Sequence, residues 1–464
     1  MYDMKEAKRI LIVGDVMLDI YIKGEAKRLS PEAPCVVLSG CSSPTSKLGG
    51  ASNVAYQLSE NNVVSLCGRI GDDHWGNEIL RIAQKEHISV ANLIIDSSKT
   101  TTKTRYISNS NHQLLRVDED TINGIPEETI CKIIEEIIAG SYDAVVLSDY
   151  GKGVLTDSLC KSVIDSCNEA GIPSIIDIKH SPYNKFRNAT LIKGNEKELR
   201  ELGIFLGIEG TDTFNLLKSI SLFLDCRYAV VTLGKNGIAG YSKNDGFIEI
   251  PATDIPIHDV TGAGDVVTAF ITVLLANQIS FEEALRLANN AAQHKVSQFG
   301  TSRVSFDRIC SPCPKLINDV SDILKNRLDK KIVFTNGCFD VLHAGHVDLL
   351  LKAKNLGDIL VVGLNSDSSI NKLKGTNRPI NSFENRAKVL SALNCVDYIV
   401  KFEEQTPYDL ISKLTPDILV KGGDYTLDTI VGADIVLNNG GSVTTIPFTV
   451  STSSTNILIQ LGYE

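Results

Sequence analysis

Two short segments contain residues whose types and spacing could carry out chemistry on phosphate groups. The first is HDVTGAGDVVTAF, residues 258–270, in which Gly262, Ala263 and Gly264 precede Asp265 and a helical run. A glycine-rich turn at the start of a helix directs backbone N–H groups and the helix dipole at one spot, where a phosphoryl group can be held. A carboxylate one residue later can accept the proton of an attacking hydroxyl. The segment predicts phosphoryl transfer, although spacing alone favours a structural glycine turn equally.

The second segment is TNGCFDVLHAGH, residues 335–346, which places His343 and His346 three residues apart at the start of a helical run. Both imidazoles fall on one face of the helix start, where free N–H groups favour phosphate, and Gly345 lets a nucleotide come close. Such imidazoles can donate hydrogen bonds to the charge that builds on an α-phosphate. Metal binding is the rival interpretation, but no third ligand is evident and the glycine context suits phosphate better.

Three further segments of the first half strengthen the prediction of phosphoryl transfer over that of a structural turn. LGGASNVA places two glycines and then Asn53 at a helix start. NEKE places Asn195 and Glu198 on one helical face, which suits hydrated Mg²⁺ near phosphates. TLGKNG, which begins at Thr232, ends a strand in a glycine turn.

Taken together and in this order, these segments resemble the ribokinase-like carbohydrate kinases over about residues 8–304. The resemblance implies that Asp265 is the catalytic base and that the amides of the glycine turn form the anion hole. It also implies that Asn195 and Glu198 organise Mg²⁺ indirectly. For Asp19, in GDVMLD, a carboxylate that caps a turn at a strand end is the alternative. The residues implied at the nucleotide are Thr232, Gly234, Gly237 and Asn289, and those implied at the sugar are Asp19, Gly49, Gly50 and Asn53.

The second half contains further groups that suit a nucleoside triphosphate. KLKGTNRPI supplies Lys374 and Arg378, ENR supplies Arg386, and STSSTN offers hydroxyls that can cap a helix while contacting phosphate. With the histidine pair, these segments resemble the HxGH nucleotidyltransferases related to glycerol-phosphate cytidylyltransferase, over about residues 329–464. For Arg378 and Arg386, solvated surface charge is an equally good interpretation. The resemblance implies a nucleotide site formed by Asn336, Gly337, Phe339, His343, His346, Lys374, Ser453, Ser454 and Thr455.

The order of the two parts resembles the bifunctional heptose 7-phosphate kinases and heptose 1-phosphate adenylyltransferases. Short sequence segments agree with this family, among them RLSPEAP, SDYGKGVLT and LVKGGDY. The resemblance implies ATP-dependent phosphorylation of D-glycero-β-D-manno-heptose 7-phosphate at O1. It also implies adenylyl transfer from ATP to heptose 1-phosphate, which gives ADP-heptose for lipopolysaccharide core synthesis and releases pyrophosphate. The kinase product would carry phosphates at both ends, whereas the transferase is expected to accept heptose 1-phosphate. Because no segment resembles a phosphatase, a separate phosphatase would act between the two steps.

Two alternatives remain, a kinase and transferase pair for another sugar or polyol phosphate and a non-catalytic scaffold descended from enzymes. The intact Asp265 and histidine pair argue against the scaffold. Two departures from the family are LIKG, where relatives usually show Thr-Pro, and SST, where they usually show STT. Lys193, in LIKG, either contacts a phosphate or extends to solvent. A substrate that carries a 7-phosphate needs cations, and the candidates that follow strands are Lys103, Arg105, Arg116, Lys152 and Lys179.

The elements that must position these groups are short β-branched runs that alternate with helix-length segments. RILIVGDV, YDAVVLSDY and ATLIKGN are examples in the first series, and a second series begins at KKIVFTNG. The pattern predicts right-handed crossovers in mostly parallel sheets. We therefore expect an α/β protein, and the resemblance implies a ribokinase-like kinase domain with a small β lid at residues 1–305. A linker at 306–328 and a Rossmann-like nucleotidyltransferase domain at 329–464 would follow.

The composition limits the partners and the location. The 464 residues are 43% hydrophobic and 22% charged, and the formal charge of −10 argues against binding to nucleic acid or an anionic membrane. No apolar stretch is long enough to cross a bilayer, and the eleven scattered cysteines suit reduced thiols, so we expect a cytoplasmic enzyme. Cys310 and Cys313 form a CxxC without a second pair to complete a zinc site. Mg²⁺ and ATP are the expected cofactor and co-substrate, a monovalent cation stays open, and the resemblance implies a homodimer formed through the lid.

Overall fold

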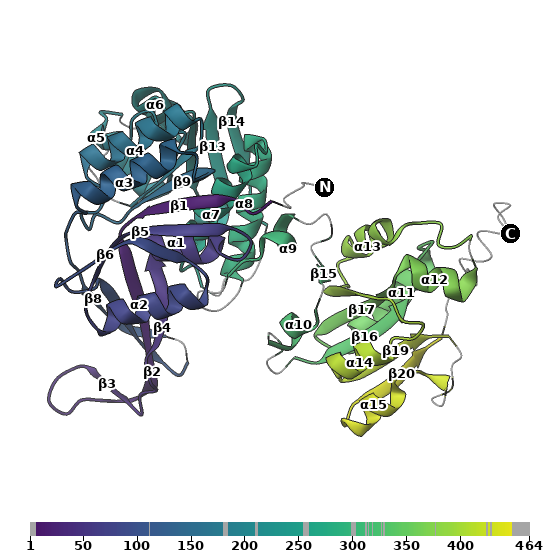
Figure 1. Ribbon diagram of the computed structural model, residues 1–464. Coiled ribbons are helices and arrows are strands. Elements are labelled where there is room, and N and C mark those ends of the chain that lie inside the picture. The colour runs from purple at the N-terminus through teal and green to yellow at the C-terminus, as the bar shows by residue number, and fades with distance from the viewer. Residues whose placement is uncertain are drawn as a thin grey trace. The chain divides into compact units, whose positions relative to one another are not determined.

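The computed structural model describes residues 6–110, 112–179, 184–208, 212–253, 259–297, 303–310, 313, 315–317, 319–325, 327, 330–375, 377–423, 426 and 429–447. The chain divides into two compact units, Tyr2–Ile309 and Cys310–Glu464. Each unit is built around its own sheet (Figure 1). Among the described residues, no helix is long and apolar enough to cross a membrane.

The first unit is built on a nine-stranded sheet in the order β14-β13-β12-β11-β10-β9-β1-β5-β6. The strands from β12 to β6 are parallel, and β13 and β14 are antiparallel additions at one edge. The buried apolar runs predicted as strands form the centre, as in β1 and β9. The strands are β1 (Arg9–Gly14), β5 (Val63–Gly71), β6 (Ser89–Asp96), β9 (Ala144–Asp149), β10 (Ser174–Ile178), β11 (Leu191–Asn195), β12 (Tyr228–Thr232), β13 (Ile238–Ser242) and β14 (Gly246–Ile250).

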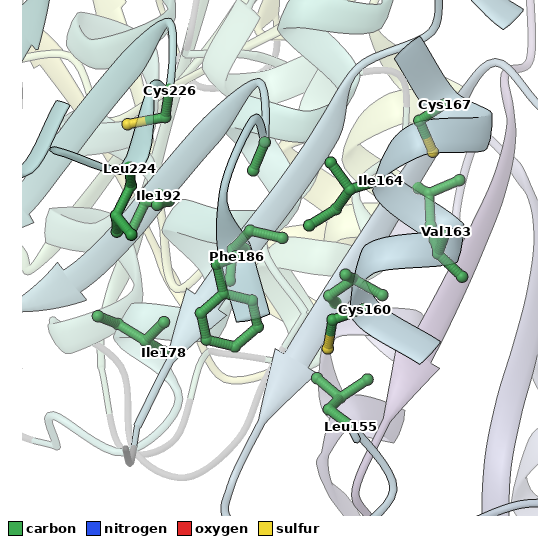
Figure 2. Close-up of a cluster of buried hydrophobic side chains, with 14 of the residues drawn as sticks. Leu155, Cys160, Val163, Ile164, Cys167, Ile178, Phe186, Ile192, Leu224 and Cys226 are labelled. Atoms are coloured by element: carbon green, nitrogen blue, oxygen red, sulfur yellow. The ribbon is translucent and has the colours of Figure 1, made fainter. Parts of the chain in front are cut away.

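Helices connect these strands. A core between the sheet and α3 to α6 includes Phe186, whose ring lies among Ile178 of β10 and Cys160 and Ile164 of α4 (Figure 2). Helix α7 packs against α1 and α8 and also contacts β9, β10 and β11. The helices are α1 (Ala51–Leu58), α2 (His74–Lys85), α3 (Glu127–Ile138), α4 (Asp157–Ala170), α5 (Glu196–Phe205), α6 (Thr213–Leu224), α7 (Ala263–Ala276), α8 (Phe281–Val296) and α9 (Phe306–Cys310), with short 3-10 helices at Asn184–Phe186 and Gly234–Asn236.

A second, smaller sheet in this unit is the predicted β lid. Strand β2 (Val16–Leu29) follows β1 after one residue and pairs with β3 (Val36–Ser39), β4 (Thr45–Gly50) and β7 (Thr102–Ser108), and β7 pairs with β8 (Gln113–Glu119). Asp19 lies opposite Lys47 of β4 and opposite Lys103 of β7. Because paired residues on neighbouring strands project from the same face, these three side chains form one group.

The second unit is built on a six-stranded parallel sheet in the order β15-β18-β17-β16-β19-β20. One face packs on α11 and α13, and the other packs on α10, α14 and α15. The chain runs outward from β16 to β17 and β18 and then returns to β19, on the other side of β16. The elements are β15 (Leu316–Ile317), α10 (Ser321–Lys325), β16 (Ile332–Gly337), α11 (Ala344–Lys354), β17 (Ile359–Asn365), α12 (Asp367–Lys374), α13 (Phe383–Ser391), β18 (Tyr398–Phe402), α14 (Tyr408–Leu414), β19 (Ile418–Gly422), α15 (Ala433–Asn438) and β20 (Ser442–Ile446).

The α/β class, the mostly parallel first sheet and the Rossmann-like second unit confirm the predicted fold. Part of the segment expected to be a linker belongs to the second sheet, because β15 pairs with β18. The limits at residues 305 and 329 stay a prediction.

Candidate active sites

Asp265 lies in the first turn of α7 and is buried, with 6% of its surface exposed. Two side chains donate hydrogen bonds to its carboxylate: Asn53 Nδ2 lies 2.5 Å from Oδ2, and the Tyr150 hydroxyl lies 3.0 Å from Oδ1. Burial raises the pKa of Asp265, although the charge of Lys179 opposes the change. A carboxylate that is fixed by two donors and has a raised pKa suits general-base work.

The turn before α7 has the conformation that its glycines predict. Gly262 caps the helix with φ of 77°, which glycine adopts without strain. A Cβ on Gly264 would lie 3.1 Å from Lys193 Nζ and 3.4 Å from Lys179 Nζ, so two ammonium groups approach the start of the helix. The start of α7 and two lysines therefore meet where an anion would bind.

Lys193 is fully buried and does not extend to solvent, which removes one of its two interpretations. Its Nζ donates to Asp177 Oδ1 at 2.9 Å and to the carbonyl of Gly264 at 3.0 Å. Burial lowers the pKa of Lys193. For Lys179, burial is outweighed by the charges of Asp177 and Asp265, so its pKa is raised and it stays charged. We conclude that Asp177 holds the ammonium groups of Lys179 and Lys193 beside the glycine turn.

A cavity of about 490 Å³ opens beside this turn. It brings together the glycine turn, Asp265, both buried lysines and the residues predicted at the nucleotide. The residues predicted at the nucleotide come from the ends of β11 and β12, from the turn between β12 and β13, and from α8. Only the tertiary fold brings them together. The predicted residues that line the cavity are Asn195, Thr232, Gly234, Gly237, Gly262, Ala263, Gly264, Asp265 and Asn289.

Asn195 and Glu198 form a capping box at the start of α5. Asn195 Oδ1 accepts from the Glu198 amide at 2.9 Å, and Glu198 Oε2 accepts from the Asn195 amide at 2.6 Å. Burial raises the pKa of Glu198. Within the described ranges, no group of three or more His, Cys, Asp or Glu could hold a metal by itself. The side-chain oxygens of Asn195 and Glu198 are of the type that suits contact with a hydrated magnesium ion.

The residues predicted at the sugar gather on the lid strands and at α1. Arg105 Nη1 lies 2.6 Å from Asp19 Oδ1, in the interior of the lid sheet, so Asp19 does not cap a turn at a strand end. Gly49 leaves room for this carboxylate, because a Cβ there would lie 3.1 Å from Asp19 Oδ2. Gly50 has φ of 57° and leads into the helix that carries Asn53.

The other candidate cations differ in their surroundings. Lys103 Nζ lies 5.2 Å from the centre of the Tyr150 ring, and burial lowers its pKa. Arg116 lies on an exposed strand and pairs with Asp118 at 2.9 Å, whereas Lys152 pairs with Asp120 at 2.6 Å. Arg116 and Lys152 therefore already have carboxylate partners, whereas Lys103 faces the group around Asp265.

Tyr150 was not among the predicted site residues, although it lies in the segment SDYGKGVLT. Asp15 fixes this residue, because Oδ2 accepts from the Tyr150 amide at 2.8 Å and from the Lys152 amide at 3.0 Å. The ammonium groups of Lys103 and Lys179 lie 5.2 and 5.5 Å from the centre of the Tyr150 ring. No spacing rule predicts this contact, because the loop reaches Asp265 from a distant part of the chain.

The histidine pair of the second unit is in place at the start of α11. His343 caps the helix, and its ring centre lies 3.9 Å from that of His346. Phe339 lies 5.1 Å from the His346 ring. Burial lowers the pKa of both imidazoles, to about 4 for His346, so both are neutral at neutral pH. Each Nδ1 is buried with no hydrogen-bond partner among the residues that the structure describes, so each can bond to a ligand.

Arg378 and Arg386 are not solvated surface charges. Arg378 Nε donates to Asp340 Oδ2 at 2.6 Å, while its Nη2 is buried without a partner in the described part of the chain. Arg386 is 1% exposed and donates to the carbonyls of Cys338 and Asn365 and to Asp367. Arg386 thus holds together the loops after β16 and β17, while Arg378 keeps one donor for a ligand.

The remaining residues predicted at this site have different outcomes. Lys374, at the end of α12, is exposed, and its charge helps to lower the pKa of His346. Asn336 accepts a hydrogen bond from Lys421, and Gly337 leaves space for the Phe339 ring, which lies 3.0 Å from where a Cβ would be. Ser453, Ser454 and Thr455 lie outside the described residues.

Comparison with known proteins places this pair of sites in a family. A family model described as pfkB family carbohydrate kinase matches residues 7–307, and one described as cytidylyltransferase-like matches residues 334–457. The bifunctional protein HldE of Campylobacter curvus is 41% identical over 449 residues, which covers 93% of this chain and 94% of that protein. The chain belongs to the HldE family. The HldE of Geobacter sulfurreducens is 38% identical and covers 97% of this chain and 95% of that protein.

Solved structures support the kinase fold of this HldE family member. Phosphofructokinase-2 from Escherichia coli, in complex with potassium, aligns with a TM-score of 0.55 and 18% identity, over 66% of this chain and 97% of that one. Arabidopsis thaliana ribokinase, complexed with ribose and ATP, aligns with a TM-score of 0.51 and 20% identity, over 64% and 94%. The chain thus joins a carbohydrate kinase and a nucleotidyltransferase, each with its own site.

Proposed function

We propose that the kinase unit phosphorylates O1 of D-glycero-β-D-manno-heptose 7-phosphate. One observation carries the reaction type: the carboxylate of Asp265, held by Asn53 and Tyr150, lines the 490 Å³ cavity at the glycine turn. Asp265 takes the proton of the O1 hydroxyl while O1 forms a bond to the γ-phosphorus. The bond from that phosphorus to the bridging oxygen breaks, and ADP leaves.

Several residues would lower the barrier to this transfer. The amides at Gly262 to Gly264 and the charges of Lys179 and Lys193 would stabilise the transferring phosphoryl group. Asp19 and Asn53 would bind sugar hydroxyls. Lys103 and Arg105 would lie at the sugar, where their charges suit its phosphate. Magnesium, bound to the phosphates of ATP near Asn195 and Glu198, would neutralise their charge when present.

The second unit would transfer an adenylyl group from ATP to heptose 1-phosphate. An oxygen of the sugar phosphate forms a bond to the α-phosphorus, and the bond to the bridging oxygen breaks to release pyrophosphate. His343 and His346, both neutral, can donate N–H groups to the charge that develops on the α-phosphate. ATP rather than CTP is the donor because the full-length resemblance is to adenylyltransferases. A competition between the two nucleotides tests this choice, and equal turnover with CTP would contradict it.

The pathway needs further components. A separate phosphatase must remove the 7-phosphate between the two steps, because the kinase product carries phosphate at both ends.

A second copy of the chain would pair through the lid, where large apolar side chains are exposed. These are Leu29, Val36, Leu115 and Val117, with exposed fractions of 67%, 47%, 55% and 42%. A monovalent cation as activator is tested by kinase assays with and without potassium.

Phosphorus NMR of the protein with heptose 7-phosphate, ATP and Mg²⁺ tests the whole scheme. We expect the reaction to stop at the 1,7-bisphosphate and ADP-heptose to form once a 7-phosphatase is added. ADP-heptose without the phosphatase would contradict the order of steps. A matched panel of other sugar and polyol phosphates tests the alternative substrate class, and faster turnover of any of these would replace heptose.

A further inference from the structure

Lys421 lies where the second sheet reverses its strand order. It is the fourth residue of β19, and β19 pairs with β16 through Ile418 and Leu419. Strands β17 and β18 lie on one side of β16, and β19 and β20 lie on the other. In an open parallel sheet, ligands bind outside the carboxyl ends of the strands at such a switch point. Lys421 is therefore at the position where the fold places a ligand.

The surroundings of Lys421 leave its charge uncompensated. Its ammonium group donates to the side-chain oxygen of Asn336, across the switch point, and this amide is neutral. No ion pair between Lys421 and a carboxylate occurs among the described residues of the second unit. Burial lowers the pKa of Lys421 to about 8. A partly buried ammonium group beside a neutral amide is a ready partner for an anion.

Among the residues that the structure describes, three polar atoms in the segments that follow β16 and β17 lack partners. Nδ1 of His343, Nδ1 of His346 and Nη2 of Arg378 are buried and have no hydrogen-bond partner in the described ranges. His343 and His346 lie on or just before α11, which follows β16 and covers it together with β17. Lys421 lies on the other side of β16. One ligand group at the histidines and a second at Lys421 would meet over the end of β16.

We propose that Lys421 binds the phosphate of the sugar 1-phosphate, the group that attacks ATP in the transferase site. This inference rests on the proposed adenylyl transfer and assigns the triphosphate to the histidine pair. Two phosphates must approach each other in the reaction, and their repulsion opposes the approach. A cation on the acceptor side offsets that repulsion, while the Asn336 amide holds the ammonium group in position.

The test measures the steady-state constants of the transferase with heptose 1-phosphate and ATP. Lys421→Met keeps the length of the side chain and removes its charge. We expect KM for the sugar phosphate to rise about tenfold to a hundredfold, the scale of one charged hydrogen bond, and KM for ATP to change by less than about twofold. Lys421→Arg should restore much of the loss. The matched control is Lys401→Met, on β18, where the exposed lysine pairs with Glu403 at 3.0 Å.

Binding of inorganic phosphate gives a second measurement that needs no turnover. Phosphate should compete with the sugar phosphate for the wild type and inhibit Lys421→Met more weakly. An unchanged KM for the sugar phosphate in folded Lys421→Met would overturn the proposal, and so would a rise confined to KM for ATP. If the wild type fails to use heptose 1-phosphate, the proposed function is wrong. Phosphate titration of wild type and variant by NMR then still decides whether Lys421 binds the anion.

Discussion

The hydroxyl of Tyr150 lies 3.0 Å from Oδ1 of Asp265 and donates a hydrogen bond to it. The tyrosine belongs to the loop after β9, and the aspartate belongs to the first turn of α7. Asp15 holds the backbone of that loop through the amides of Tyr150 and Lys152. Asp265, the proposed kinase base, is thus positioned by a loop that is itself fixed by a second, buried carboxylate.

Tyr150→Phe should move the acid limb of the kinase pH profile to higher pH. A donor to a carboxylate favours its charged form, so loss of the hydroxyl raises the pKa of Asp265 further above its usual value. The other groups around this carboxylate, Asn53, Lys179 and Asp177, are unchanged, and the phenyl ring still faces the two lysines. We expect turnover to fall about tenfold at neutral pH, the scale of one hydrogen bond to a charge. An unshifted profile would show that Tyr150 does not act on the base.

Asp265→Asn should lower kinase turnover by about a hundredfold or more, because the amide cannot accept the O1 proton. Substrate binding should persist, since the side chain keeps its shape. The adenylyltransferase rate of the same variant serves as an internal control for folding. Near wild-type phosphorylation of heptose 7-phosphate would exclude Asp265 as the base.

A mixture of two single variants should restore the complete pathway. Asp265→Asn blocks the first step and His343→Ala blocks the second, and each leaves the other site intact. With ATP, Mg²⁺ and a 7-phosphatase present, the intermediates can diffuse from one variant to the other. ADP-heptose should therefore appear in the mixture and in neither variant alone. Failure of the mixture with folded proteins would mean that the two sites depend on each other.

His346 should make the protein less stable in mild acid. Burial and the charges of His343 and Lys374 lower its pKa to about 4 in the folded state, below the ordinary value of 6.5. The unfolded chain therefore takes up a proton first as pH falls below 6.5, and stability is lost progressively between pH 6.5 and 4. His346→Asn should flatten the fall of Tm over that window, measured by scanning calorimetry. An equally steep fall in this variant would assign the acid sensitivity to other groups.

Lys193→Met should destabilise the kinase unit by roughly 3 kcal/mol, because Asp177 keeps its buried charge and loses a partner. Lys179 remains 3.4 Å from Asp177 and limits the loss. Unfolding in urea measures the change, and Lys197→Met, on an exposed part of α5, is the matched control. Equal stability of both variants would show that Lys179 alone balances Asp177.

The fold class and the local geometry of the sites could be predicted from the sequence, because they depend on residues close together in the chain. The apolar runs predicted as strands form β1 and β9, and the glycine at 262 adopts the positive φ that its type allows. The histidine pair predicted a helix start, and α11 begins directly after His343.

The partners of those residues could not be predicted in the same way. Asn53 and Asp265 are 212 residues apart, and only the packing of α1 against α7 brings them together. The sequence could not decide whether Lys193 contacts a phosphate or extends to solvent, because its partner, Asp177, lies on the neighbouring strand. Arg386 could not be assigned to a surface or a site role because its carbonyl partners, Cys338 and Asn365, lie at or just after the ends of two other strands. Such contacts depend on the tertiary fold, which no local spacing encodes.

The way β2 pairs in the lid has a consequence for how substrate preference could change. One strand supplies Asp19, and its two neighbours supply Lys47 and Lys103 at the same level. The hydrogen-bonded register fixes the spacing of these three groups, whereas Asp265 and the nucleotide cavity belong to the main sheet and its helices. The sugar recognition that we propose for these strands would therefore be exchangeable as a unit. Exchange of β2, β4 and β7 between relatives should carry the preference for a sugar with it and leave the phosphoryl-transfer chemistry in place.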